Sequence, residues 1–212
     1  NTFQALGAQA FDSLIVPSSD GKPKPGLAER WEIAPDGLTH TFYLRKGVKF
    51  QDGSDLTGAD VKFSFDALMD PNSTGDGKVW LASIASIDLK DDYTIVFRFK
   101  QPQFELLVGF ENYSGADGVV PKKVVETMGW DKFARNPVGS GPFKVLSISA
   151  NTRMELEAVE SHWRKVPQFK NVTLVNVKEE ASKVAQLKTG ELDIATISPD
   201  SAAGLKAAGL KV

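Results

Sequence analysis

Hydrophobic residues at the start of the chain recur at the spacing of a helix. The apolar positions are Phe3, Leu6, Ala10 and Leu14. Side chains three or four residues apart share one helix face, so this spacing predicts an opening helix. Residues 17–21, with the sequence PSSDG, then end the pattern in a turn.

Between residues 28 and 50 the hydrophobic period changes from that of a helix to that of a strand. A Pro-Asp-Gly turn at residues 35–37 separates two strand-like runs. In the second run, His40, Phe42 and Leu44 alternate with the residues at 39, 41 and 43. This alternation predicts a β-hairpin with one buried face.

The clearest helix start in the sequence is at Thr57. Thr57 can cap the helix, and Asp60 three residues later can complete a capping box. The apolar stripe that follows consists of Val61, Phe65 and Leu68. Because Pro71 cannot continue a helix, we expect the helix to end just before it.

A second hairpin follows over residues 84–100, with its turn at Asp91 and Asp92. Its predicted inward-facing residues are Ile95, Phe97 and Phe99. A short helix is then expected between Pro121 and Gly129.

The last third of the chain alternates between strand and helix patterns. Residues 143–148, 153–159 and 172–177 read as strands, followed by a helix that ends at Gly190. Residues 193–197 read as a further strand. Ser198 as N-cap and Pro199 at the first helical position predict a last helix, and residues 209–212 resemble the start of another strand.

The clustering of these elements predicts an α/β (mixed α+β) fold. Hairpins dominate the middle of the chain, while the two flanks mix helices and strands. We expect residues 1–34 and 122–212 to form a first lobe around a mixed sheet, and residues 35–121 to form an inserted hairpin-rich subdomain.

Composition and charge narrow the classes of function. The formal net charge is −2, and the lysines are interspersed with acidic residues, so the basic surface of a nucleic-acid binder is not expected. The chain has no cysteine, which excludes disulfides, thiolate metal sites and a cysteine nucleophile. The first residues read as folded helix and not as a signal peptide, so we expect that a leader was removed or that the chain begins inside a longer protein.

Several segments, in order, resemble the family 5 extracellular solute-binding proteins. These segments are PGLAERWEI at residues 25–33, TFYLRKGVKFQDG at 41–53, LTGADVKFSF at 56–65, NPVGSGPFKV at 136–145 and LKTGELDIA at 187–195. Each segment alone is a modest match, but their order and spacing are specific. The departures are small, among them Gln51 where the family usually has His, the order of Gly58 and Ala59, and Ser140 in place of Thr.

The resemblance implies a type II periplasmic-binding-protein-like lobe with an inserted β-rich subdomain, the second lobe being absent from this chain. It also implies the solute-binding component of a bacterial ABC importer, which captures a small ligand in an interlobe cleft and delivers it to ABC permease subunits in the membrane. Oligopeptides and dipeptides are the expected ligands, although the family also binds nickel chelates, opines and oligosaccharides. We expect a monomer located in the periplasm or lipid-anchored at the outer face of the cytoplasmic membrane, with no nucleic-acid partner.

Five residues are candidates for contact with the ligand. Trp80 follows a polar loop, and Asn112 with Tyr113 follows the apolar run 106–110, so these side chains bring rings and polar groups to places where a cleft could open. Ser140 and Gly141 lie in a loop that the family places at the interlobe cleft. Packing in the core is the alternative for Trp80 and Tyr113, and a tight turn is the alternative for the Gly-Ser-Gly loop.

Catalysis, cofactors and metals are not expected. A nucleophile and base pair would require His40 or His162, and both read as structural histidines. Residues 70–76 imitate the start of an EF-hand loop, but Leu81 stands where the bidentate Glu is required. Trp31 and Trp130 are assigned to packing.

One alternative function remains open at this stage. The same fold could serve as the ligand-sensing module of a regulatory or signalling protein. A signal peptide upstream would favour transport, and a helix-turn-helix segment would favour regulation. Because the acidic partner of a peptide amino terminus is implied to lie in the second lobe, we expect this chain alone to bind ligand weakly.

Overall fold

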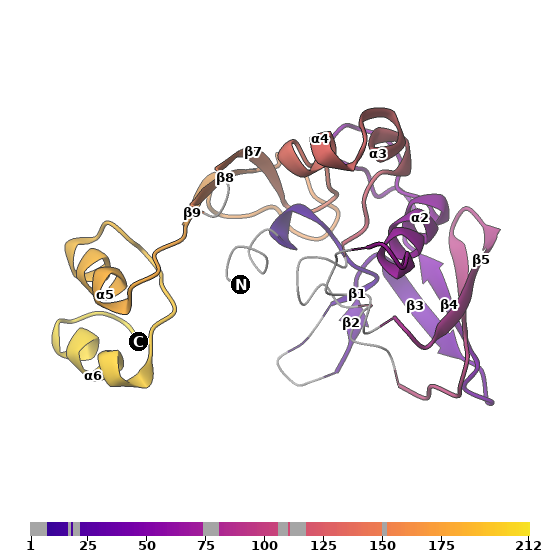
Figure 1. The fold of residues 1–212 in the computed structure, drawn as a ribbon, viewed down its shortest axis with the longest axis horizontal. Coiled ribbons are helices and arrows are strands. Elements are labelled where there is room, and N and C mark those ends of the chain that lie inside the picture. The colour runs from indigo at the N-terminus through magenta and orange to yellow at the C-terminus, as the bar shows by residue number, and fades with distance from the viewer. Residues whose placement is uncertain are drawn as a thin grey trace. The chain divides into compact units, whose positions relative to one another are not determined.

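The computed structural model describes residues 8–16, 18, 22–73, 81–105, 110, 118–149 and 152–212. The chain divides into two compact units (Figure 1). The first comprises Asn1–Ile148 and Met154–Leu174, and the second comprises Ser149–Arg153 and Val175–Val212. The fold class is the mixed α/β class expected from the sequence.

The predicted opening helix is largely wrong within the described residues. Only a 3₁₀ turn, η1 (Ala8–Ala10), is present, and residues 11–14 are not helical. The carbonyls of Ser13 and Leu14 accept hydrogen bonds from the N–H groups of Leu27 and Ala28, both at 2.9 Å. These carbonyls therefore pair with a distant segment, and β1 (Ile15–Val16) continues that pairing against β2 (Lys24–Pro25).

A four-stranded antiparallel sheet forms the centre of the first unit, in the order β3-β4-β6-β5. Its strands are β3 (Ala28–Ile33), β4 (Thr39–Leu44), β5 (Ile84–Asp91) and β6 (Thr94–Phe99). Both predicted hairpins are confirmed, and His40, Phe42 and Leu44 are buried as the alternation requires. Val96, which the alternation places on the opposite face, is buried as well.

Helix α2 (Gly58–Met69) packs against this sheet (Figure 1). Asp60 Oδ2 accepts the N–H of Thr57 at 2.9 Å, which is the hydrogen bond that the N3 side chain makes in the predicted capping box, and it also accepts the Thr57 hydroxyl at 3.0 Å. The Phe97 ring contacts those of Phe42, Phe65 and Phe110 edge-on or at a tilt, at centroid distances of 5.4, 5.1 and 4.8 Å. Such aromatic pairs add about 0.5–1.5 kcal/mol each beyond their buried area, so these rings anchor the core.

Two short helices, α3 (Lys122–Met128) and α4 (Trp130–Arg135), follow in the first unit. Asp60 Oδ1 accepts the N–H of Lys122 at 2.9 Å, which ties the start of α3 to the start of α2. Gly129 joins the two helices with a φ of 79°, a value in the region that favours glycine. The predicted helix between Pro121 and Gly129 is confirmed.

A three-stranded sheet in the order β7-β8-β9 comprises β7 (Phe143–Ser149), β8 (Arg153–Ala158) and β9 (Asn171–Val175). These are the three strands predicted in this part of the sequence. The predicted lobe and subdomain boundaries stay a prediction. The pairing of β3 with β4 shows that one sheet spans the predicted boundary after residue 34.

The second unit contains helices α5 (Glu180–Thr189) and α6 (Pro199–Ala207). Gly190 ends α5 in the left-handed conformation, and Ser198 and Pro199 begin α6, all as predicted. The strand predicted at residues 193–197 is wrong, since this segment is irregular and Ile194 is 88% exposed. None of the described strands pairs with it, and an unpaired strand leaves its backbone groups without partners. Residues 209–212 likewise form no strand.

Candidate functional site

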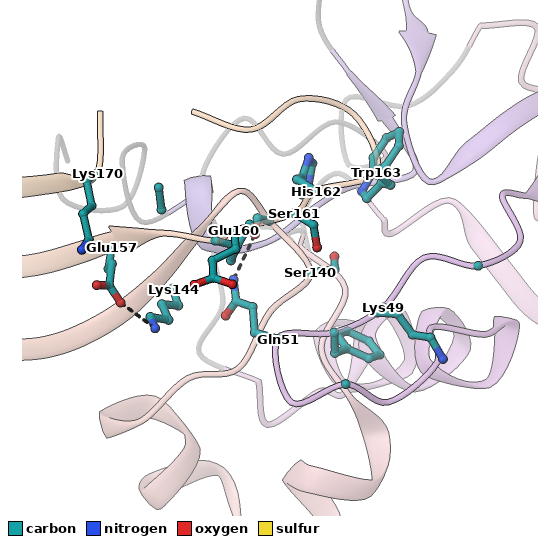
Figure 2. A pocket seen from close by; sticks show the side chains of 16 residues that line it. Lys49, Gln51, Ser140, Lys144, Glu157, Glu160, Ser161, His162, Trp163 and Lys170 are labelled. Atoms are coloured by element: carbon teal, nitrogen blue, oxygen red, sulfur yellow. Dashed lines mark hydrogen bonds and ion pairs between the residues drawn. The ribbon is translucent and has the colours of Figure 1, made fainter. Parts of the chain in front are cut away.

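A pocket of about 730 Å³ lies in the first unit (Figure 2). One wall comes from the loop after β4, with Lys49 and Gln51. A second comes from Ser140 and Gly141 in the loop before β7, and a third from residues 157–163 at the end of β8 and beyond. Segments far apart in sequence therefore meet around one space.

The Gly139–Gly141 loop lies directly against η1. A Cβ atom on Gly139 would lie 1.8 Å from Ala10 O, and one on Gly141 would lie 2.4 Å from Gln9 O. The N–H of Gly141 donates to Ala10 O at 3.0 Å. Glycine is therefore required at positions 139 and 141, where the close approach of another backbone segment leaves no room for a side chain.

The side chain of Gln51 joins two walls of the pocket. Its Nε2 donates to Gly141 O at 3.0 Å and to Phe143 O at 2.9 Å, while its Oε1 accepts the N–H of Gly139 at 3.2 Å. The N–H of Gln51 also donates to Gly139 O at 2.8 Å. The amide supplies both a donor and an acceptor to a backbone that needs both, so it holds the loop after β4 against the loop before β7.

Asp12 is a buried carboxylate behind the pocket wall. Its Oδ2 accepts the indole N–H of Trp163 at 2.8 Å and the hydroxyl of Ser140 at 3.1 Å. Its Oδ1 accepts a guanidinium N–H of Arg164 at 3.2 Å. Burial of an unpaired carboxylate would be very costly, and these donors compensate for it. The Ser140 hydroxyl donates its proton to Asp12, so only the acceptor lone pairs of its oxygen and its backbone groups are left for other contacts.

His162 completes the group of residues around Asp12. Its Nε2 lies 3.3 Å from Asp12 Oδ2, and its Nδ1 accepts the backbone N–H groups of Arg164 and Lys165 at 3.2 and 3.3 Å. An amide N–H can only donate, so the ring proton lies on Nε2. His162 is therefore a structural residue that orders the segment after β8, as the sequence predicted.

Charged side chains of both signs line the pocket. Lys144 Nζ and Glu157 Oε2 form an ion pair at 2.5 Å, drawn in Figure 2, and Lys170 and Glu160 also line the pocket. The hydrogen bond and the charge of Lys144 hold the pKa of Glu157 below its ordinary value. The pocket therefore offers partners for a cationic and for an anionic group at once.

The structure brings together two of the five predicted ligand residues. Ser140 and Gly141 both line the pocket. Trp80, Asn112 and Tyr113 lie outside the described residues, and a contact of any of the five with ligand stays a prediction. Sequence reasoning assigned no role to Asp12 and treated Gln51 only as a departure from a family pattern, because their partners are 41 or more residues away along the chain.

The described residues include no group of three or more His, Asp or Glu side chains placed to hold a metal ion. His40 is buried against Phe99 and hydrogen bonds through Nε2 with Gln103 O at 2.8 Å. Burial lowers the pKa of His40. Within the described part of the chain, neither histidine contacts a serine or threonine as a general base would.

All the lining residues of this pocket belong to the first unit. Comparison with known proteins identifies the class of protein. Residues 22–212 match the family model described as Bacterial extracellular solute-binding proteins, family 5 Middle. The chain belongs to this family, which consists of transport binding proteins and not of enzymes.

Two curated relatives illustrate the similarity. The chain is 30% identical to the periplasmic oligopeptide-binding protein OppA of Haemophilus influenzae, an alignment that covers 88% of this chain and 38% of the relative. It is 29% identical to the glutathione-binding protein GsiB of Salmonella choleraesuis, over 96% of this chain and 40% of the relative. The chain thus spans about two fifths of the length of these relatives.

A solved structure shows the same fold. The crystal structure of Haemophilus influenzae OppA in complex with RPPGFSPFR matches with a TM-score of 0.84 and 28% sequence identity, over 98% of this chain and 44% of that chain. The type II binding-protein architecture expected from the sequence is confirmed by this likeness.

Proposed function

We propose that the protein is the solute-binding component of a bacterial ABC importer and that its ligand is an oligopeptide or a dipeptide. The observation that carries this proposal is the family match over residues 22–212, together with the similarity to an oligopeptide-binding relative over most of the chain. The importer's permease subunits would be its membrane partners. The proposed location is extracytoplasmic, and among the described residues no helix is long and apolar enough to cross a bilayer.

The chemistry of the first pocket supports a zwitterionic ligand. Lys144, Glu157 and Lys170 place both charges within one opening. A peptide with free termini carries both charges, so its amino terminus can pair with a glutamate and its carboxyl terminus with a lysine. A strongly anionic solute would be repelled by the glutamates, and a strongly cationic solute by the lysines. Ser140 and Gly141 would contribute backbone groups to this ligand, and Trp80, Asn112 and Tyr113 are proposed as further contacts.

The test is a thermal-shift screen of the full-length protein. The probes are di- to pentapeptides, glutathione, nickel with histidine, and short oligosaccharides. A ligand that binds only the folded state raises the melting temperature by an amount that grows with its concentration. We expect a shift with peptides, and a response confined to another class would overturn the peptide assignment.

Two variants connect the result to the pocket. Glu157→Gln removes one charge of the pocket, and Glu155→Gln on the same strand is the matched control, since Glu155 does not line the pocket. We expect the peptide-dependent shift to shrink with the first variant alone. Equal responses of the two variants would argue against this pocket as the ligand site. Loss of peptide uptake on deletion of the gene tests the transport role itself, and unchanged uptake with altered gene expression would favour a sensory module.

A further inference from the structure

A second pocket, of about 520 Å³, lies in the first unit at the C-terminal end of helix α2. Its lining includes Ser64, Leu68, Asp70, Asn72, Val120 and Trp130, and none of its lining residues belongs to the first pocket. The described lining residues contain one carboxylate, that of Asp70, and no lysine, arginine or histidine. Its charge therefore differs from the mixed charge of the first pocket.

The Trp130 indole packs against two aromatic rings and also lines the second pocket. It stacks on Phe63 with a centroid distance of 5.8 Å and an interplanar angle of 5°, and Phe133 meets it edge-on at 6.0 Å. Yet 49% of Trp130 is exposed, so a large part of its surface is accessible. A braced aromatic ring with a free surface in a pocket is typical of a ligand platform, because little conformational entropy is lost when a ligand stacks on it.

Asp70 supplies the charge of this pocket. It caps the C-terminal end of α2, and its Oδ1 accepts the N–H of Asn72 at 2.7 Å. Within the described part of the chain, Oδ2 has no hydrogen-bond partner. A carboxylate oxygen with free lone pairs and an indole surface both attract a cation, the first by charge-assisted hydrogen bonding and the second through its ring quadrupole.

We propose that this second pocket binds an organic ammonium group, with Trp130 contacting its alkyl and cationic surface and Asp70 neutralising its charge. A neutral sugar could stack on Trp130 but would leave the charge of Asp70 without a partner, and an anion would be repelled. The ammonium could belong to a free amine or to the amino terminus of a peptide. The proposal does not depend on the importer function, because it concerns residues that the first pocket does not use.

The test is a titration followed by NMR of the protein with ¹⁵N-labelled tryptophan. Tetramethylammonium chloride is added, with sodium chloride as the ionic-strength control, and the Trp130 indole signal is assigned with Trp130→Phe. We expect a saturable shift of the Trp130 signal alone. The Trp31 signal serves as the internal reference, because Trp31 lines neither pocket.

Substitutions at two similar turns separate binding from local structure. Asp70→Asn should weaken tetramethylammonium binding several-fold. Asp36→Asn is the matched control, because Asp36 Oδ1 likewise accepts the N–H two residues later, at 2.9 Å, and lies outside the pocket. This control should leave binding unchanged.

The outcomes distinguish the ligand classes. A non-saturable shift, equal shifts of all indole signals, or a glucose response as strong as that of tetramethylammonium would overturn the proposal. A shift with glycylglycine that disappears with N-acetylglycylglycine would support it and identify a peptide amino terminus as the source. A shift limited to tetramethylammonium would support it and identify a free quaternary amine.

Discussion

The two units of the molecule are stabilised in different ways. In the first unit, aromatic residues from β4, α2 and β6 are almost completely buried, among them Phe42, Phe65 and Phe97. In the second unit, α5 has no buried residue, and Leu205 is the buried residue of α6. Polar contacts are prominent there, because Glu180 accepts hydrogen bonds from the Ser198 N–H and from the hydroxyls of Ser198 and Ser201.

This difference predicts in which unit a substitution should change the free energy of unfolding most. Buried apolar area is the dominant favourable term in folding, so the first unit should resist unfolding while the second opens at lower free energy. Both pockets lie within the first unit. Their geometry therefore depends on the core of that unit.

Removal of a central aromatic ring should have the largest effect. Phe97→Ala leaves a cavity among three neighbouring rings and should lower the free energy of unfolding by about 3–5 kcal/mol. Val184→Ala in α5, where no residue is buried, should cost less than about 1 kcal/mol. Denaturant unfolding measures both, and comparable losses would contradict the contrast between the units.

Glycine substitutions should have opposite effects in the two units. A Cβ on Gly139 would collide with Ala10 O, so Gly139→Ala should destabilise the first unit by about 1–3 kcal/mol. Gly204 lies inside α6 with nothing within 4 Å of an added Cβ. Gly204→Ala should therefore stabilise α6 by about 1 kcal/mol. Thermal unfolding and amide hydrogen exchange give these values, and the contrast fails if both variants change stability in the same direction.

Acid should weaken the first unit through His40. Burial lowers the pKa of His40 in the folded state from its ordinary value of 6.5. As the pH falls below about 6.5, the unfolded chain takes up the proton first, so the stability of the fold decreases through this range and down to the lower folded pKa. We expect His40→Gln to flatten the dependence of unfolding free energy on pH between 7 and 5, and an unchanged slope would show that His40 does not titrate differently on folding.

The smallest effect is expected at Glu180. Hydrogen bonds from Ser198 and Ser201 lower the pKa of Glu180 from its ordinary value, so its contribution is present above that ordinary value and is lost as the pH falls through the lowered one. Glu180→Gln should raise amide exchange at the start of α6 a few-fold and leave the first unit unchanged. Glu179→Gln is the neighbouring control. Uniform exchange changes across both units would show that they do not open separately.

Much of the fold was predictable because the relevant signals are local. The alternation in β4 and the cap and stop signals of α2 and α6 are contained in a few residues each. Predictions failed where the secondary structure depends on backbone hydrogen bonds to a distant segment. The carbonyls of Ser13 and Leu14 accept hydrogen bonds from a distant segment, and none of the described strands lies beside residues 193–197, although three of these five residues are apolar.

The first pocket was predictable only in part. The Gly-Ser-Gly loop stands out in the sequence, but the residues that shape it do not. Gln51 and Asp12 act on partners brought close by folding, and no periodicity in the sequence reports such contacts. Trp130 was assigned to packing, and the structure shows that packing accounts for only part of its surface.

The sequence by itself determined the family, the fold class and most element boundaries, because caps, turns and alternation depend on the backbone within a few residues. Only the tertiary structure decided which polar groups meet. Gln51 holds two loops together, Asp12 gathers donors from beyond β8, and Trp130 keeps an open surface beside Asp70. Each of these depends on distances through space between residues that the chain order keeps apart, and hydrogen bonds and ring contacts act only over a few ångströms.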